Sequence, residues 1–151
     1  MNLPKVYSGK GTKLAASKKV RLRVILDANF FFLPLQFNLD IFEELAKLLN
    51  KRYEPIMLSS TKKELQGLAE STSIKTKKQA VNAISLGAKC FFVPVEKSDT
   101  ETYDDVIVRV ATESKIPVAT NDRNLRKRLR HSGIAVIYMR QKQQLVLEGS
   151  V

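Results

Sequence analysis

Acidic side chains follow the ends of the predicted strands, where a parallel α/β sheet places its chemistry. They are Asp27 after the first strand, Glu64 in the first turn of the helix after the second, Asp104 and Asp105 at the start of the helix after the third, and Asp122 after the fourth. Carboxylates that converge on one edge repel one another unless a cation lies among them. Because their ligands are oxygen only, the expected cation is hard, Mg²⁺ or Mn²⁺, which activates water for in-line displacement at a phosphate.

Most of these acids also have a structural explanation. Residues 61–64 fit a capping box in which Glu64 reaches back to the helix start. Residues 104–105 suit the positive end of a helix dipole, and Asp122 fits the N-cap of a helix from residue 123. Asp27 ends a buried strand and is expected to cap no helix, so its carboxylate needs a partner or a metal.

Strands and helices alternate along the chain and position these acids. Short apolar runs predict strands, and helical spacing or cap residues predict helices. The predicted strands are 20–26, 55–58, 91–95, 116–120 and 134–138, and the predicted helices are 38–51, a helix ending near 69, 73–87, 102–114 and 123–131. This alternation predicts an α/β fold, a three-layer α/β/α sandwich with a central, mostly parallel sheet of four to five strands.

Charge divides the 151 residues into three expected parts. The net charge is +11, and residues 1–26 hold seven bases and no acid. Residues 1–19 are predicted to be a flexible basic arm, residues 20–140 the catalytic domain, and residues 141–151 a C-terminal tail. A basic arm before a mildly basic domain indicates a polyanionic partner, with nucleic acid first and an anionic membrane second.

Composition excludes several other classes of site. His131 is the only histidine and Cys90 the only cysteine, so neither a Cys/His zinc site nor an internal disulfide can form. Cys90 is interpreted as a small buried hydrophobe and His131 as a helix-end cation. No apolar stretch is long enough to cross a bilayer, and a single thiol suits a reducing compartment. The expected protein is soluble and cytoplasmic, without membrane association.

Three segments and one glutamate together resemble the PIN-domain nucleases. The segments are 26–29 (LDAN), 103–108 (YDDVIV) and 118–125 (VATNDRNL), and the glutamate is Glu64. The resemblance covers residues 20–140, and the continuation through 138 is similar to the small-subunit ribosomal-RNA processing branch. Eukaryotic members of that branch carry a Cys/His zinc element, which this chain cannot form, so it resembles an archaeal-type member. VapC-type toxins are more distant relatives.

The resemblance implies a metal-dependent endoribonuclease that acts on single-stranded RNA. It implies metal ligation by Asp27, Glu64, Asp105 and Asp122, with Asn29 and Thr120 as polar supports. Asp104 is the alternative third acid, and the family pattern favours Asp105. The expected products carry a 3′-hydroxyl and a 5′-phosphate, and the expected substrate is a ribosomal precursor RNA.

Basic side chains are concentrated in two segments of the sequence, the N-terminal arm and the predicted helix after Asp122. The expected RNA-binding residues are Lys10, Lys13, Lys18 and Lys19 in the arm and Arg123, Arg126, Lys127, Arg128 and Arg130 after Asp122. Phosphate contacts of this kind give salt-dependent affinity without sequence specificity. A solvated helix face is the plain alternative for the second group. Residues 30–32, three phenylalanines, are interpreted as a buried apolar loop rather than a base-stacking surface.

Two other functions remain open at the level of sequence. One is a VapC-type toxin ribonuclease paired with an antitoxin, and the other is a non-cleaving RNA-binding PIN scaffold in ribosome assembly. A missing acid would indicate the scaffold, and none is missing. A homodimer and ribosome-assembly factors are the further expected partners.

Overall fold

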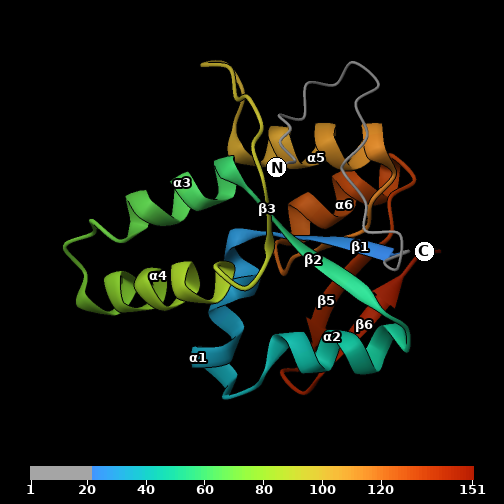
Figure 1. Cartoon of the computed structure of the whole chain (residues 1–151), viewed down its shortest axis with the longest axis horizontal. Helices are drawn as coiled ribbons and strands as arrows, with labels where there is room; N and C mark the ends of the chain where they lie inside the picture. The colour runs from blue at the N-terminus through green and yellow to red at the C-terminus, as the bar shows by residue number, and fades with distance from the viewer. Residues whose placement is uncertain (1–21) are drawn as a thin grey trace.

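A six-stranded sheet forms the middle layer of the protein (Figure 1). The structure, a computed structural model, describes residues 22–151. The strands are β1 (Leu22–Leu26), β2 (Tyr53–Leu58), β3 (Phe91–Val93), β4 (Val118–Ala119), β5 (Val136–Arg140) and β6 (Gln144–Glu148). Their order across the sheet is β3-β2-β1-β4-β5-β6, and only the β5–β6 pair is antiparallel.

Helices cover both faces of this sheet. They are the short 3₁₀ helix η1 (Ala28–Phe32), α1 (Leu33–Phe37), α2 (Ile41–Leu49), α3 (Ser59–Leu68), α4 (Ile74–Gly87), α5 (Tyr103–Ser114) and α6 (Arg123–His131). One apolar core cluster joins the sheet to η1, α1 and α2, and the other joins it to α5 and α6. The three-layer α/β/α prediction is therefore confirmed.

The side chains of β1 alternate between the two faces of the sheet, so this strand contributes to both apolar core clusters. Val24 and Leu26 belong to the first core cluster, whereas Ile25 belongs to the second, because successive strand side chains point to opposite faces. All three are fully buried. β1 lies between β2 and β4 in the centre of the sheet, and Asp27, the residue that follows it, is buried.

The carboxyl ends of five strands define one edge of the sheet. β1 to β5 run parallel, and η1, α3 and α6 begin beside the ends of β1, β2 and β4. α5 follows β3 after a longer connection. All the predicted acids therefore belong to connections or helix starts that leave this one edge.

The sheet has one strand more than predicted. β6 lies within the segment 141–151 that was expected to be a tail, and it pairs with β5 through a tight turn. Gln141 and Lys142 in this turn both have positive φ, 56° and 59°, as tight hairpin turns require. The predicted arm 1–19, with Lys10, Lys13, Lys18 and Lys19, lies outside the described residues.

Within residues 22–151, none of the helices is both long and apolar enough to cross a membrane.

Candidate active site

Asp27 is fixed at the end of β1 by bonds to two neighbours. The Ala28 amide donates to Asp27 Oδ1 at 2.8 Å, and the Thr120 hydroxyl donates to Asp27 Oδ2 at 2.7 Å. β1 and β4 pair here, since the Asp27 amide donates to the Ala119 carbonyl at 3.0 Å. Asp27 is also the N-cap of η1, so the expectation that it caps no helix was wrong.

Thr120 and Asn29 form a polar network around this carboxylate. The Thr120 Oγ1 accepts from the Asp122 amide at 3.0 Å and lies 3.3 Å from Asn29 Oδ1. Asn29 Oδ1 also accepts from the Asn121 amide at 3.0 Å, while the Met139 amide donates to Asn121 Oδ1 at 2.8 Å. The network ties the ends of β1, β4 and β5 together and sets the position of Asp122.

Asp122 begins α6 and keeps one carboxylate oxygen free of contacts in the described chain. Its Oδ1 accepts from the Asn124 amide at 2.8 Å and the Leu125 amide at 3.0 Å. The predicted N-cap is therefore confirmed. Among residues 22–151, no donor bonds Asp122 Oδ2, so the cap leaves one oxygen for a second role.

Glu64 lies in the second turn of α3 and makes no capping box. The helix begins at Ser59 with Leu58 as its N-cap, so the predicted capping box of residues 61–64 was wrong. The Ser59 hydroxyl is engaged with the backbone of Val95, accepting from its amide at 2.8 Å. Glu64 is half-buried, and this burial and the negative charges of the other acids raise the pKa of its carboxyl group.

Asp104 and Asp105 have different surroundings at the start of α5. Asp105 Oδ2 accepts from the Thr102 amide at 2.9 Å, and Asp105 Oδ1 forms an ion pair with Arg128 Nη2 at 2.9 Å. Within residues 22–151, the Asp104 carboxylate has no hydrogen-bond donor. The backbone bond from Thr102 and the bond from Arg128 lower the pKa of Asp105. Burial and then the Asp122 charge raise the pKa of Asp104, although the nearby charge of Arg128 lowers it in part.

Burial and mutual repulsion raise the pKa of two acids strongly. Burial raises the pKa of Asp27 to about 6 against the hydrogen bonds from Thr120 and Ala28, and Asp104 and Asp122 add to the rise. Burial raises the pKa of Glu64 to about 7, with further contributions from Asp27, Asp104 and Asp122. Asp27, Glu64, Asp104 and Asp122 therefore influence one another, and Asp105 also acts on Asp104.

These pKa values predict a stability that falls as the pH rises. The folded-state pKa values of Asp27 and Glu64, about 6 and 7, exceed the values 3.8 and 4.5 of the free side chains. The folded state then binds more protons than the unfolded state across this window, so stability is lost towards neutral pH. The lowered pKa values of Asp105 and Glu101 act at more acidic pH.

Thermal unfolding of EDTA-treated protein measures this effect. From about pH 4.5 to about pH 8, the Tm is expected to fall by ~4 °C relative to the double variant Asp27→Asn/Glu64→Gln. Equal pH profiles for the two proteins would contradict the repulsion between the acids.

The acid cluster, defined here as Asp27, Glu64, Asp104 and Asp122, has the charge and chemistry for a hard cation. In the described chain, every lysine or arginine ion pair involves other acids, including Arg128 with Asp105. No three acid, histidine or cysteine side chains of residues 22–151 are gathered into a ready metal-binding group. The four carboxylates nevertheless repel one another, and the charge of Arg128 offsets this repulsion in part at Asp104. An oxygen-only donor set with excess negative charge fits Mg²⁺ or Mn²⁺.

Three residues at this edge were not expected from the sequence. Ser60 lies one helical turn before Glu64, and its hydroxyl is buried without a partner among the described residues. Arg140 ends β5 and Lys142 follows in the turn to β6, so both lie at the carboxyl edge. Arg140 and Lys142 were missed because β6 was not predicted. Ser60 could have been found from the sequence, because it lies one helical turn before Glu64.

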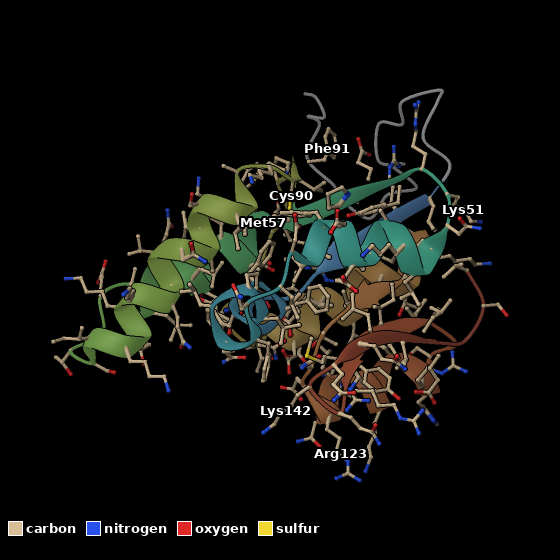
Figure 2. All side chains as sticks on the ribbon, turned by 90° about the horizontal axis from the view of Figure 1, so that it is seen from below. Lys51, Met57, Cys90, Phe91, Arg123 and Lys142 are labelled. Carbon is tan, nitrogen blue, oxygen red and sulfur yellow. The ribbon has the colours of Figure 1, made fainter. Side chains whose placement is uncertain are left out.

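The predicted basic run of α6 divides into side chains with different contacts. The Arg126 guanidinium stacks 3.8 Å from the Tyr138 ring centroid, and Arg130 Nη1 donates to the Ile134 carbonyl at 3.3 Å. Arg128 pairs with Asp105. Arg123 and Lys127 are exposed without an ion pair in residues 22–151. In Figure 2, Arg123 and Lys142 both lie at the lower end of the molecule, whereas Lys51 lies at the upper right.

The three phenylalanines after the Asp27 motif belong mainly to the core. Phe30 and Phe31 are completely buried, and Phe32 packs against the first core cluster. They form η1 rather than an irregular loop. The buried interpretation is confirmed. Cys90 is half-buried, and burial raises the pKa of its thiol to about 12, in keeping with a packing role.

The protein is a mostly parallel α/β sandwich with acids at the carboxyl edge of its sheet, and comparison identifies the family. Residues 24–142 match the family model described as a PIN-like domain. The chain therefore belongs to the PIN-like domain family, which confirms the resemblance. Ribonuclease VapC4 of Methanocaldococcus jannaschii is 28% identical over 130 residues, which cover 85% of this chain and 98% of that protein.

Solved structures show the same architecture. The PIN domain endonuclease Utp24 superposes with a TM-score of 0.70 and 27% identity, covering 85% of this chain and 92% of that one. VapBC2 from Rickettsia felis, bound to a DNA fragment from its promoter, gives a TM-score of 0.56 at 15% identity, covering 79% of this chain and 100% of that one. The second likeness concerns the fold alone. The relatives thus include both branches that the sequence resembles.

Proposed function

We propose that this protein is a divalent-metal-dependent endoribonuclease that cleaves single-stranded RNA. One observation carries the proposal: four mutually repelling carboxylates lie at the carboxyl edge of a PIN-like sheet, and none of them is in an ion pair with a described lysine or arginine. The similarity to Ribonuclease VapC4 and to the endonuclease Utp24 supports RNA phosphodiester hydrolysis.

Each carboxylate of the acid cluster has a proposed role in holding the metal ion. Asp27, Glu64, Asp104 and Asp122 would hold Mg²⁺ or Mn²⁺, and Asp104 replaces Asp105 because the latter is engaged by Thr102 and Arg128. When bound, the ion supplies Lewis-acid activation of water and stabilises charge on the scissile phosphate. Thr120 and Asn29 orient Asp27 and the chain around Asp122. Cleavage would leave a 3′-hydroxyl and a 5′-phosphate.

Ribosomal precursor RNA is the substrate that we favour. The match to Utp24, with 92% of that chain covered, supports a place among processing endonucleases. The exposed bases Arg123 and Lys127 on α6, with Arg140 and Lys142 in the β5–β6 hairpin, provide phosphate contacts at the cutting edge. A homodimer and ribosome-assembly factors are the expected partners, and the expected location is the cytoplasm.

A toxin ribonuclease of the VapC type is the second candidate. The similarity to Ribonuclease VapC4 over 98% of that protein favours it. An antitoxin reading frame beside the gene and crosslinks to transfer RNA would support this candidate. Crosslinks near one end of a ribosomal RNA in native cells would support processing.

Cleavage of a labelled single-stranded RNA tests the shared chemistry. Mn²⁺ or Mg²⁺ is expected to support cleavage with 5′-phosphate products, and EDTA is expected to slow it more than about 100-fold. Cleavage that is unaffected by EDTA would contradict the metal-dependent mechanism. RNA binding without cleavage under any metal would instead identify a non-cleaving scaffold.

A further inference from the structure

A pocket lies between α5 and α6, and one of its lining residues, Arg128, is paired with Asp105 next to Asp104 of the acid cluster. Its volume is about 460 Å³, and it is largely open to solvent. Its lining residues are Val108, Lys127, Arg128, His131 and Ser132. The two helices lie on the same face of the sheet (Figure 1). The pocket thus combines one apolar wall with basic side chains, which suits a base joined to a phosphate.

Asp105 connects this pocket to the start of α5. The Thr102 amide donates to Asp105 Oδ2 at 2.9 Å, and the Asp105 amide donates to Thr102 Oγ1 at 3.0 Å. This reciprocal capping box fixes the carboxylate, whose Oδ1 then holds Arg128 Nη2 at 2.9 Å. Both oxygens of Asp105 are therefore engaged in holding a helix start and a guanidinium.

Arg128 is suited to bind a second anion while it contacts Asp105. Its side chain is 46% exposed, and its known carboxylate contact uses the Nη2 end of the guanidinium. An arginine offers five donors in a rigid fork that matches phosphate oxygens. Because Asp105 already restricts the side chain, less conformational entropy is lost when a phosphate binds.

We propose that Arg128 and this pocket form a subsite for the nucleotide next to the scissile phosphate of single-stranded RNA. Arg128 binds the flanking phosphate, Lys127 and His131 border it, and Val108 contacts the base. Asp105 is a positioning residue that holds Arg128, and it is not a metal ligand. The subsite rests on the proposed function only in taking RNA as the polyanion.

Fluorescence anisotropy with a fluorescein-labelled oligouridine in EDTA tests the subsite without cleavage. Arg128→Ala is expected to weaken binding about tenfold and to reduce the slope of log affinity against log salt by about 0.7. Arg128→Lys keeps the charge without the fork, so the salt slope is expected to stay while part of the affinity is lost. Arg52→Ala is the matched control, because Arg52 precedes β2 at the opposite edge of the sheet.

A double-mutant cycle tests the positioning role of Asp105. Asp105→Asn is expected to weaken RNA binding less than Arg128→Ala, and the double variant is expected to bind no more weakly than Arg128→Ala alone. Mn²⁺ affinity, measured by calorimetry, is expected to stay within about twofold of wild type in both single variants. A merely structural role would not give this non-additive loss of RNA binding in a fully folded protein.

Two results would overturn the subsite. One is an Arg128→Ala variant with the RNA affinity and salt slope of Arg52→Ala, and the other is loss of Mn²⁺ binding in Asp105→Asn. Failure of the proposed function has a different signature. Wild-type protein would then bind RNA through Arg128 but would not cleave it with any divalent metal.

Discussion

Asp27→Asn is expected to abolish RNA cleavage and, at neutral pH, to make the metal-free protein more stable. The change removes a negative charge from a carboxylate that is only 4% exposed and lies near Asp104 and Asp122. Cleavage is expected to fall more than about 100-fold, because the ion loses a ligand that no neighbour replaces. The asparagine keeps the bond from Ala28 and can donate to Thr120, so the fold has no reason to fail.

Thermal or urea unfolding measures the second half of this prediction. The pKa of about 6 for Asp27 implies that the variant gains about 1–2 kcal/mol in free energy of unfolding near pH 7. Asp99→Asn, a matched change at an exposed aspartate, is expected to alter neither cleavage nor stability. A destabilised Asp27→Asn protein, or one with wild-type cleavage, would refute the role of Asp27.

Asp104→Asn and Asp105→Asn are expected to differ sharply although the residues are adjacent. Burial and the charge of Asp122 raise the pKa of Asp104, whereas Asp105 is bound by Thr102 and Arg128. Asp104→Asn is expected to reduce the cleavage rate at saturating RNA more than about 100-fold. Asp105→Asn is expected to lose only about tenfold in kcat/KM, mainly through a higher KM.

Each of these variants is the control for the other. Both replace one carboxylate by an amide in the first turn of α5, and only Asp105→Asn also removes a carboxylate from the capping box with Thr102. Circular dichroism establishes that both proteins are folded. The reverse pattern, with Asp105→Asn inactive and Asp104→Asn active, would restore Asp105 as the third acid, as the family pattern favours.

Local sequence signals predicted the elements that position the site. The helix 123–131 was predicted with the bounds of α6, because Asp122 is an N-cap and Leu125 and Leu129 are spaced for burial. The apolar run before Asp27 likewise predicted β1. These signals are contained within one element, so they can be seen without knowledge of the fold.

Contacts between distant segments decided what the sequence did not show. The residues 59–61 offer three hydroxyl side chains as helix starts, and α3 begins at the first because the Ser59 hydroxyl is held by Val95. Asp104 and Asp105 are adjacent in the first turn of α5, and the capping box with Thr102 and the ion pair with Arg128 from α6 separate their roles. β6 depends on pairing with β5 through a turn of Gln141 and Lys142, which lacks the usual glycine or asparagine.

Calorimetric titration of Mn²⁺ into the metal-free protein tests the central claim most directly. We expect saturable binding by the wild-type protein, binding at least about 100-fold weaker in Asp27→Asn, and nearly unchanged binding in Asp105→Asn. The carboxylates of the acid cluster would then account for the site. No binding by folded wild-type protein, or equal binding by Asp27→Asn, would contradict a metal held at the carboxyl edge of this sheet.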